Sequence, residues 1–371
     1  MRSTSSNISI FDDFSKYTIW IVIRDKKKMD KCISLLQSNY GCVLGNTYYS
    51  VTEKYNLLIS VDLDTGKSIV MPNPIIKNKL DFIGIVNNKI YMVDMAGKWI
   101  AEAGIHGDTL NYYELENGLR SSDNFAYITV YEDKIYMVLR HEAAIYIFDV
   151  KDKTTNKVDL DIVLNGCILD VGVLNNNMIY VFSSGLKKCF TFSVESNMIS
   201  NFYELSVNDR IMDALIDKNR IFFLSGDAVY DLFNSCKQMF TVEAGSQCSR
   251  ICKCNDVFWI FPGRGKNIYK YRIGEKAPSK FINYPNGYEY EIQEGLWKFV
   301  GVAHNNEFYL WSMRSNNYFL KINKKTGEEV WMKPYIDNKF SFYYKILSGS
   351  QRVINEKDCD LKVYIEYVVS V

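Results

Sequence analysis

A short aromatic strand core recurs along this chain and constrains its fold more than any other feature. Each copy has four consecutive apolar residues with an aromatic ring at the second position, and successive rings are 36 to 51 residues apart. Repeats of about 40–50 residues that contain only strands are typical of β-propellers. The clear copies place their rings at Tyr91, Tyr136 and Tyr180, and looser copies follow at Phe222, Phe258 and Tyr309. A first copy can be placed before the clear ones, with Tyr48 in the aromatic position.

Each repeat is predicted to form four short strands joined by tight turns. In the unit around Tyr91, apolar runs at 82–86 and 89–94 flank an Asn87-Asn88 turn, and two further strand candidates follow. Asparagine tolerates the positive φ that two-residue hairpins need. The strand cores are apolar at consecutive positions, which is expected of sheets buried on both faces. We therefore predict an all-β fold, a β-propeller of about seven four-stranded blades; an all-β sandwich is the less favoured alternative.

The two ends of the chain carry apolar runs outside the seven repeats. They lie at 17–23 near the start, and at 342–347 and 361–369 near the end. Strands from both termini that share one blade would close the ring and remove its free sheet edges. Such strands either complete the first blade or build an eighth blade together, which is the alternative to seven.

One short helix is predicted before the first repeat, between Asp25 and Gln37. Its apolar residues Met29, Cys32, Ile33 and Leu36 follow the i, i+3, i+4, i+7 spacing of a helix face. The helix either packs against the rim of the ring or docks a partner. The predicted domain organisation is a single propeller domain over 1–371, with an N-terminal strand and helix appendage over 1–37 and ring-closing strands over 340–371.

The overall composition argues against several classes of protein. Lys and Arg total 44 and Asp and Glu total 43, so the net charge of +1 gives no global field that would recruit nucleic acid or an anionic membrane. The first 14 residues lack the features of a secretory signal, and the apolar run at 17–23 is too short to span a bilayer. Nine scattered cysteines are expected as reduced thiols. We expect a soluble cytoplasmic protein.

A recurring hairpin adds a family resemblance to this pattern. One strand ends in Asp or Asn, and a Thr-Gly turn leads into the next strand; the clear copies are Asp62–Lys67 and Asn323–Glu328. This hairpin resembles the repeats of pyrroloquinoline-quinone-like propellers, which include quinone-dependent dehydrogenases and cofactor-free scaffolds. Enzymes of that superfamily need a calcium site and often a vicinal cysteine pair, and this chain has no Cys-Cys. The resemblance therefore implies the fold, and we predict no cofactor.

The loops between the second and third strands of the repeats are basic. In propellers these loops share a face with the connections between blades, and ligands usually bind there. Guanidinium groups that converge near a central channel suit a phosphate, a carboxylate or an acidic glycan. Solvated hairpin tips are the alternative explanation. The basic residues of these loops are Lys54, Arg140, His141, Lys187, Arg264, Lys266 and Arg314.

The longest spacing between repeats contains an insertion rich in aromatic residues, at 283–297. Long loops in compact folds are often functional, and tyrosine and tryptophan can stack on a sugar or anchor a peptide. Packing over a neighbouring blade would explain the same residues. The predicted ligand-binding set is Arg140, His141, Arg264, Lys266, Arg314, Tyr288, Tyr290 and Trp297.

Two further groups of residues carry weaker indications of chemistry. Cys248, Cys252 and Cys254 are spaced so that they could share one face of a strand. One strand cannot surround a metal ion, and the spacing is not that of zinc-binding pairs, so we predict small buried cysteines and no metal site. His141 lies between Arg140 and Glu142, and it is the candidate catalytic residue if the protein is an enzyme.

These observations favour a non-catalytic binding or scaffold propeller. It would engage a protein partner, or an anionic or glycan ligand, through its basic loop face. The sequence contains no visible nucleophile and base pair. The alternative is a cytoplasmic enzyme of the lyase or hydrolase type that uses residues of the central channel, namely His141, Arg140, Arg264 and Arg314.

Overall fold

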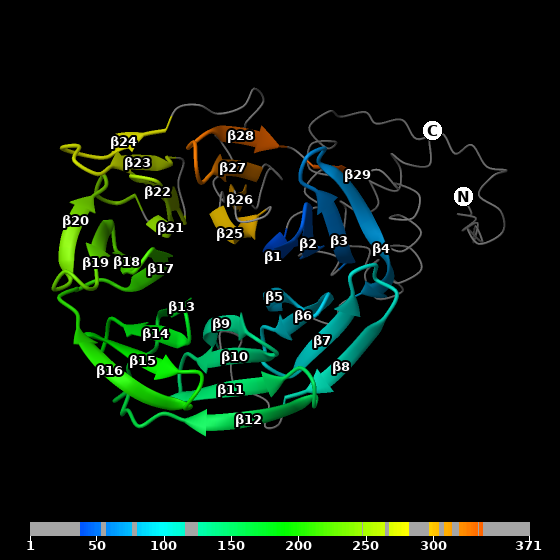
Figure 1. Ribbon diagram of the computed structural model, residues 1–371. Coiled ribbons are helices and arrows are strands. Elements are labelled where there is room, and N and C mark those ends of the chain that lie inside the picture. Colours follow the sequence, from blue (N-terminus) through cyan, green and yellow to red (C-terminus); the bar gives the residue numbers. More distant parts are fainter. Residues whose placement is uncertain are drawn as a thin grey trace, which may run out of the picture. The chain divides into compact units, whose positions relative to one another are not determined.

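The computed structural model is all-β in the part of the chain that it describes (Figure 1). The described residues belong to one compact unit, Leu35–Asn338. They include no helix that could cross a membrane. The predicted helix at 25–37, the appendage at 1–37 and the closing strands at 340–371 lie outside the described residues. The described ranges are 38–52, 57–75, 80–115, 125–246, 248–263, 267–281, 297–303, 308–313, 319–332 and 334–336.

Within these ranges the strands form six four-stranded antiparallel sheets and one five-stranded sheet. The five-stranded sheet holds β1 (Ser38–Leu44), β2 (Thr47–Thr52), β3 (Leu57–Asp62), β4 (Lys67–Ile75) and β29 (Tyr335–Ile336). The next three sheets hold β5 (Leu80–Val86), β6 (Lys89–Asp94), β7 (Trp99–Gly104) and β8 (Leu110–Glu114); β9 (Phe125–Tyr131), β10 (Lys134–Leu139), β11 (Ala144–Asp149) and β12 (Thr154–Asp159); and β13 (Val171–Asn175), β14 (Met178–Ser183), β15 (Lys188–Ser193) and β16 (Met198–Glu204). The last three hold β17 (Ile211–Asp217), β18 (Arg220–Ser225), β19 (Ala228–Asp231) and β20 (Lys237–Thr241); β21 (Cys248–Cys254), β22 (Val257–Pro262), β23 (Tyr269–Arg272) and β24 (Ser279–Lys280); and β25 (Trp297–Ala303), β26 (Phe308–Met313), β27 (Phe319–Asn323) and β28 (Glu329–Met332).

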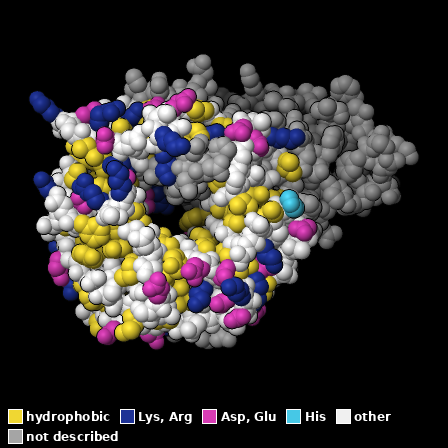
Figure 2. Space-filling view, in the orientation of Figure 1, with side chains coloured by type: hydrophobic (Ala, Val, Ile, Leu, Met, Phe, Trp, Pro, Cys, Tyr) yellow, Lys and Arg dark blue, Asp and Glu magenta, His cyan; other side chains and the backbone are white. Residues whose placement is uncertain are grey.

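The sheets are the blades of a closed ring. Each inner strand contacts the inner strand of the next sheet, from β1 through β5, β9, β13, β17 and β21 to β25, and β25 contacts β1. Figure 1 shows these strands around a common axis, and the space-filling view is hollowed there (Figure 2). The predicted all-β propeller with four-stranded blades is therefore confirmed.

The sequence predicted about seven four-stranded blades, with eight as the alternative. The described residues correct this number. Six sheets are four-stranded, and the sheet that contains Tyr48 takes a fifth strand. The reason is that β29 pairs in parallel with the outer strand β4, through Tyr335 opposite Lys67 and Ile336 opposite Ser68. The runs at 17–23, 342–347 and 361–369, which would supply an eighth blade, lie outside the described residues.

The repeated aromatic strand forms the core between neighbouring blades. On β6, Tyr91 and Val93 pack toward β10 and β11 of the following sheet, whereas Ile90 and Met92 pack toward the preceding sheet. The rings of Phe222 and Phe258, from adjacent blades, meet edge to face at 5.0 Å. Because both faces of each second strand are buried, its residues are apolar at consecutive positions.

The hairpin that resembles pyrroloquinoline-quinone-like repeats forms the turn between the third and fourth strands of a blade. The Asp62 carboxylate accepts hydrogen bonds from the amide and the hydroxyl of Thr65, both at 2.8 Å, and Gly66 follows with a φ of 76°. In the last blade, Asn323 caps the equivalent turn, and Gly327 has a φ of 74°. The left-handed φ explains the glycine that follows the threonine in each clear copy of the motif.

Most inner strands have an irregularity that the sequence analysis did not anticipate. In six of the seven inner strands, β13 being the exception, the inner strand has one more residue than the second strand opposite, which is the geometry of a β-bulge. A bulge bends its strand and redirects the neighbouring side chains. The register shifts lie between Ser38 and Gly41, Leu80 and Phe82, Phe125 and Tyr127, Ile211 and Asp213, Cys248 and Arg250, and Phe299 and Gly301.

Candidate functional site

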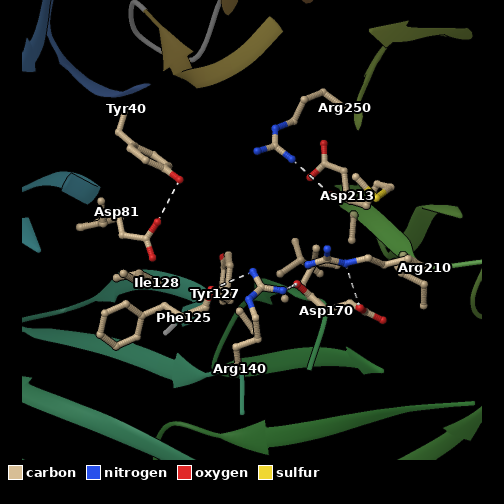
Figure 3. A pocket seen from close by; sticks show the side chains of 18 of the residues that line it. Tyr40, Asp81, Phe125, Tyr127, Ile128, Arg140, Asp170, Arg210, Asp213 and Arg250 are labelled. Atoms are coloured by element: carbon tan, nitrogen blue, oxygen red, sulfur yellow. Dashed lines mark hydrogen bonds and ion pairs between the residues drawn. The ribbon is translucent and has the colours of Figure 1, made fainter. Parts of the chain in front are cut away.

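A pocket of about 630 Å³ lies at the axis of the ring, where the inner strands begin (Figure 3). Its volume is in the range of small-molecule binding sites. The bulges of β5, β17 and β21 are at this end, so the redirected side chains lie at the pocket. The charged and aromatic residues that line it are Tyr40, Asp81, Phe82, Phe125, Tyr127, Arg140, Asp170, Arg210, Asp213 and Arg250.

Arg140 is held in place by backbone carbonyl groups from two blades. It directly follows β10, and its Nη2 donates to the carbonyl of Phe125, at 2.9 Å. Its Nη1 donates to the carbonyls of Asp170, at 3.1 Å, and Leu169, at 3.3 Å. The guanidinium therefore joins the start of β9 to the start of β13. Its position in the pocket is fixed without a ligand.

Asp170 and Arg210 form an ion pair at the pocket wall. Asp170 is 1% exposed, and its Oδ2 accepts a hydrogen bond of 2.7 Å from the amide of Ser184. Arg210 is half exposed, and its Nε lies 3.4 Å from Oδ1 of Asp170. Oδ1 has no hydrogen-bond partner among the described residues. Oδ1 is itself buried, and Arg210 is the charged group beside it.

Asp213 on β17 and Arg250 on β21 interact electrostatically, without an ion pair of the kind that Asp170 and Arg210 form. Asp213 Oδ2 accepts a hydrogen bond of 2.9 Å from the amide of Ile251. Arg250 Nη1 donates to the carbonyls of Ser249, at 3.0 Å, and Met212, at 3.3 Å. Burial raises the pKa of Asp213 to about 6, although the positive charge of Arg250 and the Ile251 amide both oppose this shift. Asp213 is therefore mainly ionised at neutral pH and becomes neutral below about pH 6.

Tyr40 and Asp81 complete the charged wall on the opposite side of the pocket (Figure 3). The Tyr40 hydroxyl donates to Oδ1 of Asp81, at 3.0 Å, and so links β1 to β5. Both residues lie at or beside the bulges of their strands. Asp81 is thereby an acceptor fixed at the pocket, as Asp170 is across it.

The structure brings only part of the predicted ligand-binding set to this site. Arg140 lines the pocket. His141 is exposed and is not among the lining residues, and Lys187 is exposed and contacts Asn208 at 3.4 Å. Trp297 begins β25, but its side chain is not described. Lys54, Arg264, Lys266, Arg314, Tyr288 and Tyr290 lie outside the described residues.

The charge of the pocket differs from the basic face that the sequence analysis expected. Three arginines and three aspartates line it, so the positive groups have negative neighbours. Acidic and basic side chains are also interspersed on the face seen in Figure 2. The lining residues that the sequence analysis missed are Tyr40, Asp81, Asp170, Arg210, Asp213 and Arg250. For Asp81, Asp170 and Arg210 the sequence signal is a charged residue at the start of an apolar run, as in Leu80-Asp81-Phe82.

The three cysteines of β21 are buried free thiols, as predicted. The prediction that the three cysteines could share one face of the strand is wrong, because the bulge between Cys248 and Arg250 changes the alternation of side chains. Cys248 packs with Phe258 toward the preceding blade, whereas Cys252 and Cys254 pack toward the last one. Burial raises the pKa of Cys248 to about 12, so it stays protonated. Among the described residues, no three potential ligands are grouped around a possible metal position.

Comparison with known proteins supports the fold and does not identify a family. No family model and no curated protein matches the chain. Among solved structures, virginiamycin B lyase from Staphylococcus aureus is 14% identical with a TM-score of 0.59, and the match covers 76% of this chain and 92% of that one. PorZ of Porphyromonas gingivalis, a component of the type-IX secretion system, is 13% identical with a TM-score of 0.52, and the match covers 80% of this chain and 38% of PorZ. Raptor of Chaetomium thermophilum is 8% identical with a TM-score of 0.55, and the match covers 79% of this chain and 28% of Raptor. At these identities the similarity shows a β-propeller and nothing finer.

Proposed function

We propose that this chain is a non-catalytic binding propeller that holds a polar ligand in its axial pocket. The ligand is a small molecule or a polar loop of a partner protein. The observation that carries this proposal is the fixed position of the charged groups at the pocket, above all of Arg140, which three backbone carbonyls hold. Groups that are ordered before binding lose little entropy on binding, so they favour recognition.

The ring supports the same role because it is rigid around the site. Each lining strand is hydrogen-bonded within its own sheet and packed against the next inner strand. The charged groups belong to different blades, and Arg140 and the Tyr40–Asp81 pair each bridge two of them. A ligand at the axis could therefore contact several blades at once without a change in the fold.

The alternative, a lyase or hydrolase that uses His141, has less support from the site. His141 is exposed and outside the pocket lining. The described lining residues contain no histidine, serine, cysteine or lysine, which are common members of nucleophile and base pairs. Similarity to a lyase in fold does not transfer its activity, since propellers of one architecture host many functions. We also propose a cytoplasmic location, which the free thiols of the described cysteines support.

Isothermal titration calorimetry with a panel of polar probes tests the proposal. The probes are inorganic phosphate, citrate, neutral and acidic oligosaccharides, and short acidic and basic peptides. We expect reversible binding of at least one probe, its loss in Arg210→Glu, and recovery of every probe chemically unchanged. Arg220→Glu is the matched control, because Arg220 is also half exposed and paired with a buried aspartate, Asp231, but does not line the pocket.

Three outcomes would contradict the proposal. Conversion of a bound probe into a product would favour the enzyme, and His141→Ala would then show whether His141 is required for turnover. Binding that Arg210→Glu leaves unchanged, or an absence of binding to every probe, would remove the axial pocket as the binding site.

A further inference from the structure

We infer that the axial pocket binds a carboxylate group of its ligand on the Arg250 guanidinium, through the edge that carries Nε and Nη2. This inference rests on the proposed function and names the ligand chemistry for the same site. The carboxylate belongs either to a small organic acid or to an acidic side chain of a partner loop, and the experiment distinguishes these two sources.

The positive charge of Arg250 has no acidic group in contact with it among the described residues. Arg250 lies on β21 and is partly buried. Its Nη1 donates to two neutral groups, the carbonyls of Ser249 and Met212. Asp213 acts on it electrostatically but forms no ion pair with it. Bonds to neutral carbonyls hold the guanidinium in place and leave its charge without a contacting counterion. Because a partly buried charge is costly without a partner, an anion at this position is stabilised.

The hydrogen bonds of Arg250 leave one edge of its guanidinium open. With the described residues only Nη1 donates, whereas Nε and Nη2 share the opposite edge. The two parallel N–H groups of such an edge match the two oxygens of a carboxylate, which they bind in a bidentate manner. In Figure 3 the guanidinium extends toward the side of the pocket where Tyr40 lies. The donors are therefore placed before a ligand arrives.

The aspartates of the pocket do not offer a comparable open group. Each one accepts a hydrogen bond from the protein: Asp81 from Tyr40, Asp170 from Ser184 and Asp213 from Ile251. The pocket therefore has equal numbers of acidic and basic side chains, but its open hydrogen-bonding edge is a donor. The same aspartates favour a carboxylate over a phosphate, because a carboxylate brings one negative charge near them and a phosphate brings up to two.

The position of Asp213 couples this binding to proton uptake. Burial raises the pKa of Asp213 to about 6, and the positive charge of Arg250 opposes that shift. A carboxylate on Arg250 offsets this positive charge and adds a negative neighbour, so it raises the pKa of Asp213 further. Binding near neutral pH should then take up a fraction of a proton, and the affinity should rise as the pH falls from 8 to 6.5.

The other charged and titratable groups of the pocket leave this coupling in place. Arginines keep their charge throughout this pH range. Tyr127 stays neutral, because burial raises its pKa, and the charge of Asp213 raises it as well. The groups that line the pocket with Asp213 are Tyr40, Asp81, Tyr127, Arg140, Asp170, Arg210 and Arg250.

Isothermal titration calorimetry with matched charged and uncharged probes tests the inference. The probes are succinate and citrate, the uncharged diamide of succinate, inorganic phosphate, and a short glutamate peptide with its glutamine counterpart. We expect a carboxylate probe to bind and its amide counterpart not to bind. Arg250→Gln should weaken binding roughly tenfold or more, the usual effect of losing a hydrogen bond between charged groups. Arg250→Lys should also weaken it, because lysine keeps the charge and lacks the two-donor edge.

Proton uptake gives a readout that a merely structural role of Arg250 would not move. Titrations at pH 6.5 in two buffers of different ionisation enthalpy measure it. Asp213→Asn keeps an oxygen that can accept from the Ile251 amide, so it should fold, lose the proton uptake and bind succinate at least as tightly as the wild type at pH 8. Arg220→Gln, outside the pocket, should match the wild type in affinity and proton uptake. Thermal melts of each variant verify folding.

The outcomes separate this inference from the proposed function. Binding of succinate or citrate identifies a small organic acid as the source of the carboxylate, and binding of the glutamate peptide alone identifies a partner loop. Binding of phosphate or neutral oligosaccharides alone, lost in Arg210→Glu, would overturn the carboxylate and leave the axial binding site intact. Carboxylate binding that Arg250→Gln and Arg250→Lys leave unchanged, or that takes up no proton at pH 6.5, would overturn the inference. An absence of binding to every probe would overturn both.

Discussion

Glu102 joins two neighbouring blades through a buried charge. It lies on β7 with only 2% of its side chain exposed, and it accepts hydrogen bonds from Lys89, at 2.7 Å, and from the Tyr91 hydroxyl, at 2.6 Å. Lys89 donates to Oε1, whereas Lys153, from the turn after β11 in the next blade, donates to Oε2, the oxygen that also accepts from Tyr91. Burial alone would raise the pKa of Glu102, but the hydrogen bonds from Lys153, Lys89 and Tyr91 outweigh burial and lower the pKa to about 2.

We predict that Glu102→Gln destabilises the fold at neutral pH by about 1–3 kcal/mol, because it leaves charge-assisted hydrogen bonds unmade. The pKa is lower in the folded state than in the unfolded chain, so the stabilisation is present above about pH 4.5 and is lost as the pH falls toward 2. The difference between variant and wild type should therefore shrink below pH 4.5. Urea unfolding at pH 7 and at pH 3.5 measures it.

Glu142→Gln is the matched control for this experiment. Glu142 is exposed and pairs with the exposed Lys157 at 3.1 Å, so its loss should change the free energy of unfolding by less than about 0.5 kcal/mol. Equal destabilisation by both variants, or a Glu102→Gln effect that stays constant between pH 7 and pH 3.5, would contradict the interpretation of Glu102 as an ionised link between blades.

At the same scale, sequence reasoning identified residues whose role is local. The aromatic rings at Tyr91 and Tyr136 and the turn at Asp62 follow from patterns within a few neighbouring residues. The pair of Asp170 and Arg210 does not, because it comes from two different blades. An aspartate before an apolar run looks the same whether it faces solvent or the axis. The pocket therefore becomes visible only in the three-dimensional structure, where the blades come together around the axis.

Among the elements, the inner strands differ most from the sequence prediction. Their existence follows from apolar runs such as 82–86, but the bulge in β5 does not, because one extra residue leaves no mark on composition. The same applies to β21, where the bulge separates Cys248 from the other two cysteines. The close approach of β9 and β13 is a third such feature: a Cβ atom at Gly172 would lie 2.8 Å from the side chain of Tyr127.

We predict that Gly172→Ala destabilises the fold by about 1–3 kcal/mol, as overpacking of a tight contact usually does. The added methyl would push Tyr127 away and weaken its hydrogen bond with the Leu174 amide. Chemical unfolding of both single variants and of the double variant Gly172→Ala/Tyr127→Ala measures the coupling between the two positions. The double variant should lose less stability than the two single losses added together, because alanine at 127 removes the clash. Strict additivity would mean that Gly172 is not constrained by Tyr127.

At the scale of the whole ring, closure depends on contacts between the first and last sheets. Lys321 on β27 is 8% exposed, and its Nζ donates to the carbonyl of Leu63 at 2.7 Å, across 258 residues of sequence. The rings of Tyr48 and Phe319 meet edge to face at 5.1 Å, and β29 pairs with β4. The sequence predicted that terminal strands would close the ring, and those strands lie outside the described residues. It did not identify Lys321, since a lysine inside a strand has no distinct pattern.

We predict that Lys321→Met lowers the free energy of unfolding by about 1–3 kcal/mol, because the carbonyl of the buried Leu63 loses its charged partner. Closing a ring over so long a segment is entropically expensive, so this contact should form after the main folding barrier. The variant should then unfold faster and refold at the wild-type rate, which stopped-flow fluorescence in urea can measure. Lys276→Met, at an exposed turn, should change neither rate. Slower refolding with unchanged unfolding would instead mean that the first and last blades meet before the barrier, and that the ring folds from its closure outward.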